Sequence, residues 1–250
     1  MDTLARRRVL VTGGSRGLGL GMVEALVARD AEVTVVARNA VHLAELRART
    51  GVSVIPGDAM DPGFAATVLR QVNPSVLVLN ASATPTMAPL HQQTWESFSE
   101  IWNADVKACF HWTQAALRLP LASGSRVLLS SSGAAIEGSP LSGGYAGAKR
   151  MIWLMAGYAN GVAGELGLGI RFQALLLRQM VGATALGRSA AEAYSRKKGV
   201  STEAFLAGFG KPLALRDFGE QVVTLLTDPR YEDGTAFGIR GETEIQRLDT

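Results

Sequence analysis

Short apolar runs alternate with longer helical patterns along almost the whole chain, and this alternation is what most restricts the fold. The runs expected to be strands lie at residues 8–11, 33–36, 52–55, 76–79, 126–129, 170–177 and 235–239. The helical patterns cover residues 18–28, 41–49, 64–72, 95–119 (as one helix or two pieces), 145–166 and 218–226. The strand runs are nearly continuously hydrophobic, as in a parallel sheet covered on both faces. We therefore expect an α/β fold with a doubly wound parallel sheet.

The same pattern continues without an evident boundary, so we expect residues 1–250 to form a single domain. No low-complexity linker divides the chain, and no repeat of solenoid period is present. Residues 178–212 fit no strand–helix unit, because they are polar, interrupted by glycine and long for a connection. Such a segment inside a compact domain is often a lid or a binding loop. We expect it to be a substrate lid.

The charge balance narrows the range of partners. The formal net charge is +3, and the basic residues are scattered, with no long run and no interleaved aromatic residues. This pattern argues against a nucleic-acid partner. No apolar run reaches the length of about 18 residues needed to cross a membrane, and the first residues enter a strand-like run at once. We therefore expect no membrane partner. Cys109 has no second cysteine to pair with, so we also expect a cytoplasmic protein.

A glycine-rich turn lies directly after the first expected strand and opens the first expected helix. It reads Thr12-Gly13-Gly14-Ser15-Arg16-Gly17-Leu18-Gly19. Glycines allow a tight turn and a close approach to a pyrophosphate, while the helix N-terminus offers free N–H groups and a partial positive charge. A tight turn that binds nothing is the alternative. The context predicts a Rossmann-type dinucleotide site, with contacts from Gly13, Ser15, Arg16, Gly17, Leu18 and Gly19.

A serine, a tyrosine and a lysine follow in an order that suits proton transfer. Ser132 comes at the end of the fifth expected strand, Tyr145 begins a helix, and Lys149 lies four residues further on the same helical face. Ionising a free tyrosine at pH 7 to 8 costs roughly 3–4 kcal/mol. A lysine ammonium about 4 Å away offsets on the order of 4 kcal/mol at an effective dielectric constant of 20. Lys149 can therefore make Tyr145 an effective acid–base group.

Taken together, the glycine spacing and this Ser–Tyr–Lys order resemble the short-chain dehydrogenase/reductase family. The likeness covers nearly all of the chain and weakens after about residue 177. It implies an oxidoreductase that interconverts a carbonyl and an alcohol on a small-molecule substrate. In that role the nicotinamide gives the hydride and Tyr145 gives the proton. Ser132 would orient the substrate oxygen, and Lys149 would also hold the nicotinamide ribose. No metal is required.

The end of the second expected strand bears on the choice of cofactor. It reads Val36-Ala37-Arg38-Asn39, without the acidic residue that usually binds the ribose of NAD. Arg38 and Arg16 could instead bind a 2′-phosphate through charge-assisted hydrogen bonds, although either could be a solvated surface residue. We therefore expect NADP(H).

The resemblance implies four further cofactor contacts: Asp58, Ala59, Asn80 and Ala81. The last two lie in Leu79-Asn80-Ala81-Ser82, which matches the family's Asn-Asn-Ala-Gly motif at two of its four positions. Asp58 as a helix cap and Asn80 as a turn residue are the alternatives.

Two segments depart from the family pattern. Asp105 stands where the family usually has an asparagine that completes a catalytic tetrad. We expect its backbone to keep that role, and its carboxylate to pair with Lys149 and shift the pH profile. After the sixth strand, Arg178 and Gln179 stand near the usual Pro-Gly. Arg178 is then either a substrate anchor or a surface residue, and Thr184 is a candidate for a displaced cofactor-binding threonine.

The sequence leaves the substrate open. After Arg178, the lid segment holds five basic residues that form either a solvated face or a site for an acidic substrate or a phosphopantetheine carrier: Arg188, Arg196, Lys197, Lys198 and Lys211. Four large apolar residues are either pocket or core residues: Met87, Trp95, Trp153 and Met155.

The family resemblance also implies a homodimer or homotetramer, formed through the helices at 95–119 and 145–166. Two rival functions remain. One is an NADP(H)-binding regulatory protein of the same fold with little or no turnover. The other is epimerisation or dehydration, for which the chain is short.

Overall fold

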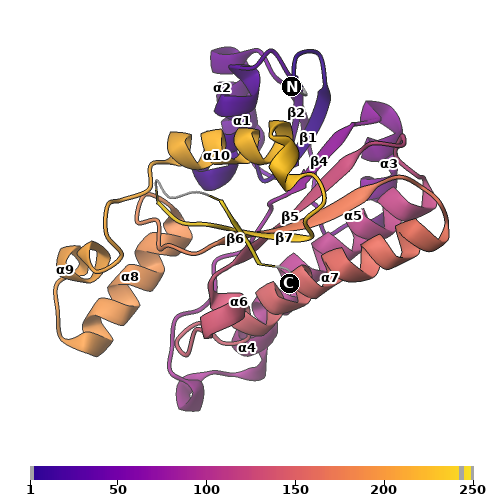
Figure 1. Ribbon diagram of the computed structural model, residues 1–250. Coiled ribbons are helices and arrows are strands. Elements are labelled where there is room, and N and C mark those ends of the chain that lie inside the picture. Colours follow the sequence, from indigo (N-terminus) through magenta and orange to yellow (C-terminus); the bar gives the residue numbers. More distant parts are fainter. Residues whose placement is uncertain (1–2, 242–244, 249–250) are drawn as a thin grey trace.

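The computed structural model describes residues 3–241 and 245–248, and its sheet lies between two layers of helices (Figure 1). The strands are β1 (Arg8–Thr12), β2 (Glu32–Ala37), β3 (Ser53–Pro56), β4 (Val76–Leu79), β5 (Arg126–Ser132), β6 (Arg171–Leu177), β7 (Ala236–Ile239) and β8 (Gln246–Arg247). Their order in the sheet is β3-β2-β1-β4-β5-β6-β7-β8. All neighbours are parallel except β7 and β8. The expected doubly wound, Rossmann-type single domain is confirmed, with an antiparallel edge strand that was not expected.

Helices cover both faces of the sheet. One layer holds α1 (Gly17–Val27), α2 (Ala40–Thr50) and α10 (Leu215–Thr227), and the other holds α3 (Pro62–Val72), α5 (Lys107–Arg118) and α7 (Tyr145–Glu165). Short helices lie in the connections: η1 (Leu90–Gln92), α4 (Trp95–Ile101), α6 (Ala134–Glu137) and η3 (Pro229–Tyr231). Over the residues described, no helix is both long and apolar enough to span a membrane.

The two apolar cores follow from the alternation of side chains along each strand. In β1, Val9 and Val11 belong to the core beneath α1 and α10, whereas Leu10 belongs to the core that contains Trp112 of α5. All four side chains are almost completely buried. A strand that is buried on both faces requires apolar residues at successive positions, which is why the strand runs are continuous in the sequence.

The strand order also places the site. From β1 the chain moves outward to β2 and β3, and it then returns to β4 on the other side of β1. The connections that leave β1 and β4 therefore diverge, and in open α/β sheets the ligand binds in the crevice at this point.

The helical region expected over 95–119 is made of two helices. A π-helical turn, η2 (Trp102–Val106), separates α4 from α5, and Asp105 lies within it. Such turns are rare and occur often at functional sites.

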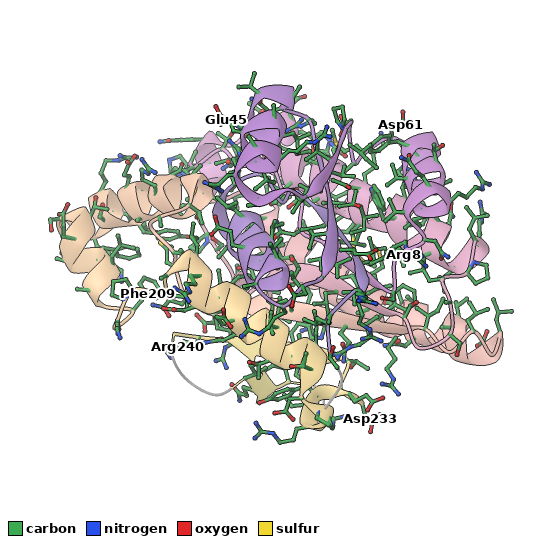
Figure 2. The ribbon with its side chains drawn as sticks, turned by 90° about the horizontal axis from the view of Figure 1, so that it is seen from above. Arg8, Glu45, Asp61, Phe209, Asp233 and Arg240 are labelled. Carbon is green, nitrogen blue, oxygen red and sulfur yellow. The ribbon has the colours of Figure 1, made fainter. Side chains whose placement is uncertain are left out.

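The lid segment 178–212, which fits no strand–helix unit in the sequence, is more regular than the sequence indicated. It contains α8 (Ala185–Lys198) and α9 (Thr202–Ala207), with side-chain caps from Thr184 and Ser201. The buried face of α8 consists of small residues such as Ala190 and Ala191, so its periodicity was hidden. Figure 2 shows this segment, with Phe209, on the side of the molecule opposite Asp61.

Candidate active site

A cavity of about 980 Å³ opens at the carboxyl ends of the strands and reaches the lid. Its volume is at the upper end of the range typical of small-molecule and cofactor sites. The cavity brings together every residue that the sequence predicts for the site except Gly19. Gly19 is buried, and a Cβ there would lie 2.2 Å from the carbonyl oxygen of Gly13. Its role is to let α1 pack against the turn, so the predicted direct contact of Gly19 with the cofactor is wrong.

Two other glycines of the turn, Gly13 and Gly17, are each required by the backbone conformation. Gly13 has a φ of 68°, and a Cβ there would lie 2.7 Å from the Cα of Ala81. Gly17 has a φ of 56°, and a Cβ there would make only an ordinary contact with the Thr184 side chain, at 3.6 Å. Both positions favour glycine, because other residues rarely adopt the left-handed region.

The N-terminus of α1 opens into the cavity. Its N-cap residue, Arg16, makes no side-chain hydrogen bond to the helix, and no acidic residue lies in the first turn. Residues 15–18 all line the cavity. The first N–H groups and the helix dipole therefore remain available for an anion, as a pyrophosphate site requires.

Thr12, the last residue of β1, holds the turn in place and was missed by the sequence reasoning. Its buried hydroxyl accepts hydrogen bonds from the backbone N–H groups of Asn80 (3.0 Å) and Ala81 (3.2 Å), and donates to the carbonyl of Val78 (3.3 Å). The Asn80 side chain in turn donates to the carbonyl of Gly13 at 3.3 Å. The sequence did contain a signal for this role, because a threonine at the end of a buried strand needs a polar partner.

Two arginines line the cavity at the nucleotide end. Arg16 comes from the glycine turn and Arg38 follows β2, and both are exposed. Within the described part of the chain, neither guanidinium forms an ion pair. Asp58 also lines the cavity, and its carboxylate accepts a hydrogen bond from the N–H of Met60 at 3.0 Å.

The predicted catalytic residues meet on one wall. Tyr145 is the first residue of α7, and the Nζ of Lys149 lies 5.6 Å from the centre of its ring. Both residues are buried, at 8% and 4% exposure. Ser132 ends β5, and its hydroxyl accepts a hydrogen bond from the N–H of Ala134 at 3.2 Å. All three line the same cavity.

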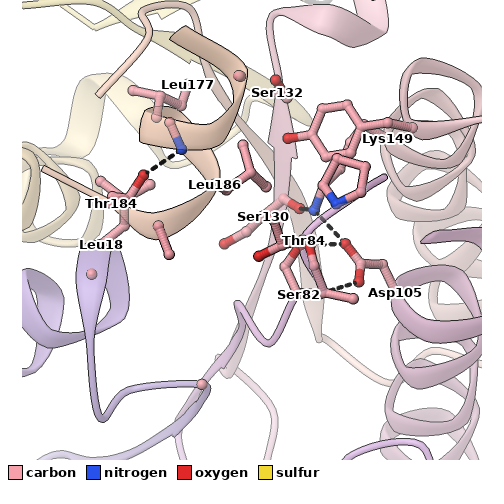
Figure 3. A pocket seen from close by; sticks show the side chains of 18 of the residues that line it. Leu18, Ser82, Thr84, Asp105, Ser130, Ser132, Lys149, Leu177, Thr184 and Leu186 are labelled. Carbon is pink, nitrogen blue, oxygen red and sulfur yellow. Dashed lines mark hydrogen bonds and ion pairs between the residues drawn. The ribbon is translucent and has the colours of Figure 1, made fainter. Parts of the chain in front are cut away.

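Asp105 forms the expected pair with Lys149 and recruits two further groups. Its Oδ2 lies 3.0 Å from Lys149 Nζ and accepts a hydrogen bond from the Ser82 hydroxyl at 2.5 Å. Its Oδ1 accepts a hydrogen bond from the N–H of Ala83 at 2.8 Å. Lys149 Nζ also donates to the carbonyl of Ser130 at 3.4 Å. Figure 3 shows this network behind the cavity, and the part of Ser82 in it was not foreseen.

The network sets the charge of Lys149. Burial lowers the pKa of Lys149, but the nearby Asp105 carboxylate raises it, and the net effect of its surroundings is a pKa above the ordinary value of 10.5. The ammonium therefore stays protonated at neutral pH. Because Asp105 is itself only 1% exposed in its side chain, the two charges are held together out of water.

Arg178, in the segment after β6, lines the cavity. Its guanidinium donates to Gln246 of β8, and its Cδ lies against Gly238. The substrate-anchor alternative for Arg178 therefore stays a prediction. The Thr184 hydroxyl accepts from the N–H of Gly187 and donates to the carbonyl of Val181, both at 2.9 Å, so it caps α8.

Most of the residues considered for substrate binding lie elsewhere. Of the five basic residues that follow Arg178 in the lid segment, Lys198 alone lines the cavity. Met87 also lines it, whereas Met155 and Trp153 belong to the core beneath α7. Trp95 is 73% exposed and stacks on a neighbouring phenylalanine outside the cavity.

Known proteins support the same family. The chain is 34% identical over 122 residues to L-xylulose reductase from Homo sapiens, covering 48% of this chain and 50% of that one. It is 34% identical over 126 residues to gluconate 5-dehydrogenase from Gluconobacter oxydans, covering 46% and 49%. It is 38% identical over 114 residues to the 3-oxoacyl-[acyl-carrier-protein] reductase MabA from Mycobacterium avium, covering 45% and 43%. The matches thus span about half the length of these relatives.

The family model described as short chain dehydrogenase covers a larger part of the chain, residues 7–192. This range runs from β1 into α8 and includes the glycine turn and the Ser–Tyr–Lys group. The chain therefore belongs to the short-chain dehydrogenase family.

Proposed function

We propose that this protein is an NADP(H)-dependent oxidoreductase that interconverts a carbonyl and an alcohol. The observation that carries the proposal is that one cavity joins an open helix N-terminus and two exposed arginines to the Ser132, Tyr145 and Lys149 group. The N-terminus of α1 and the two arginines would hold the phosphates of a nucleotide in the cavity that Tyr145 also lines. The residues present therefore fit a dinucleotide cofactor.

The residues have separate parts in the proposed reaction. A bound nicotinamide supplies the hydride in reduction and accepts it in oxidation. Ser132 donates a hydrogen bond to the substrate oxygen and stabilises the charge that develops there. Tyr145 delivers a proton to that oxygen in reduction and removes it in oxidation. Lys149 remains charged and favours the phenolate form of Tyr145, while Asp105 limits how strongly it does so.

A turnover assay distinguishes this proposal from the rival function, an NADP(H)-binding regulatory protein with little or no catalysis. The ion pair between Lys149 and Asp105 is the observation that favours the rival function. We expect NADPH oxidation with a panel of ketones, aldehydes and β-keto thioesters, and its loss in Tyr145→Phe. Tight NADPH binding without turnover on any of these compounds would establish the rival instead.

The preference for NADP(H) is tested separately by binding. Loss of charge-assisted hydrogen bonds to a 2′-phosphate costs about 1.5–3 kcal/mol, so Arg38→Ala should weaken NADPH binding roughly 10- to 100-fold and leave NADH binding almost unchanged. Arg70→Ala, an exposed arginine of α3 away from the cavity, is the matched control. Equal affinity of the unmodified protein for NADH and NADPH would contradict the preference.

A homodimer or homotetramer is part of the same proposal. The outer faces of α5 and α7 carry exposed apolar side chains, including Phe110 (47%), Leu154 (38%) and Tyr158 (61%). Burial of such a patch between copies is favourable. Sedimentation should give a dimer or tetramer, and Tyr158→Arg should shift the protein toward the monomer. A monomeric unmodified protein would refute this.

A further inference from the structure

We propose that the lid end of the cavity selects carbonyl compounds with a bulky apolar group, such as an aryl ketone, over polyhydroxylated sugars. This inference rests on the proposed function and adds the substrate class to it. It concerns the part of the cavity that is lined by residues of the lid segment 178–212.

The lid lies against the catalytic wall through one tyrosine. The loop that joins Ser132 to Tyr145 contains Ser139, whose hydroxyl is 2.9 Å from the hydroxyl of Tyr194 on α8. The same Tyr194 hydroxyl accepts a hydrogen bond from the N–H of Leu141 at 3.3 Å. Because this loop enters α7 directly before Tyr145, the surface beside Tyr194 faces the place where the substrate reacts.

That surface is aromatic. The rings of Tyr194 and Phe205 are stacked, with centres 6.0 Å apart and planes 8° apart. Phe209 meets Phe205 edge-on, with centres 5.4 Å apart and planes 74° apart. All three line the cavity, together with Met87 and Met180. Such a wall contacts a ring or hydrocarbon group favourably.

The hydroxyl groups beside the aromatic rings are already used by the protein. Tyr194 and Ser139 bond to each other, and the Ser142 hydroxyl donates to Ser139. The amide nitrogen of Gln179 donates to the carbonyl of Lys211 at 2.7 Å, whereas its Oε1 has no hydrogen-bond partner among the described residues. A sugar hydroxyl buried against the aromatic rings would lose water without gaining a partner there, which disfavours it. Lys198 also lines this end, but it is exposed and so remains hydrated.

The test compares two substrates and one lid residue. With NADPH, we expect kcat/KM for an aryl ketone such as 1-phenylpropane-1,2-dione to exceed that for L-xylulose by about 100-fold or more. Phe209→Ala should lower the value for the aryl ketone roughly 10-fold, through KM, with no change in NADPH affinity. Trp95→Ala removes an exposed aromatic residue outside the cavity and is the control. A preference for L-xylulose, or an equal loss with both substrates in Phe209→Ala, would overturn the inference.

Binding separates this inference from the proposed function. The NADPH-loaded protein should bind the alcohol that forms when the aryl ketone is reduced more tightly than it binds xylitol, whether or not turnover occurs. Selective binding without turnover would refute the proposed function and support the substrate class. Tighter binding of xylitol would refute the substrate class even in an active enzyme.

Discussion

Asp105→Asn is the substitution that examines the site most directly. The change keeps the shape of the side chain and removes its negative charge. In the native protein this charge lies 3.0 Å from Lys149 Nζ and is held by Ser82 and Ala83. After the change, the ammonium of Lys149 is left without its buried counter-ion, and it acts on Tyr145 unopposed.

The charges allow two magnitudes to be worked out. Two unit charges 3.0 Å apart attract by about 5.5 kcal/mol at an effective dielectric constant of 20, and breaking a buried pair costs about 3–5 kcal/mol of stability. For a chain of this length that corresponds to a fall in Tm of roughly 6–20 °C.

The assay is the pH dependence of kcat/KM for alcohol oxidation, which requires Tyr145 without its proton. Asp105→Asn should move the rise in rate to lower pH, because the Lys149 ammonium then acts without the opposing carboxylate. Glu165→Gln, an exposed acid at the end of the same helix as Lys149, should leave the profile unchanged. A profile and a Tm that both remain unmoved in Asp105→Asn would refute the role of the pair.

Three further outcomes follow from the structure. Thr12→Val should lower the free energy of unfolding by about 2–4 kcal/mol in urea titrations, because two backbone N–H groups lose their acceptor, and Thr12→Ser should restore most of it. Gly19→Ala should abolish NADPH binding or folding, since its Cβ would meet a backbone oxygen at 2.2 Å, whereas Gly17→Ala, where the Cβ makes only an ordinary contact, should lose only about 1–2 kcal/mol of stability. Burial raises the pKa of Cys109 from 9.0 to about 12. The folded protein then keeps a proton that the unfolded chain loses above pH 9, so stability should fall by up to about 1.4 kcal/mol per pH unit between pH 9 and 12. Cys109→Ala should flatten this dependence, and an unchanged slope would contradict it.

The sequence predicted the elements that depend on local pattern. The glycine turn, Tyr145 and Lys149 were readable because a strand, a turn and a helix impose fixed spacings on neighbouring residues. The lid helix α8 was missed because alanines, rather than large apolar residues, form its buried face. Strand β8 was missed because two residues carry too little pattern to predict a strand.

By itself, then, the sequence determined the parallel sheet, the glycine turn and the order of the Ser–Tyr–Lys group. The tertiary structure alone decided that Ser82 and Ala83 hold the Asp105 carboxylate against Lys149, and that Arg178 donates a hydrogen bond to Gln246 of β8. The physical reason is that spacing fixes only which neighbours share a helix or strand face. Contacts between distant segments depend on how the helices pack on the sheet and on which buried polar groups find partners there.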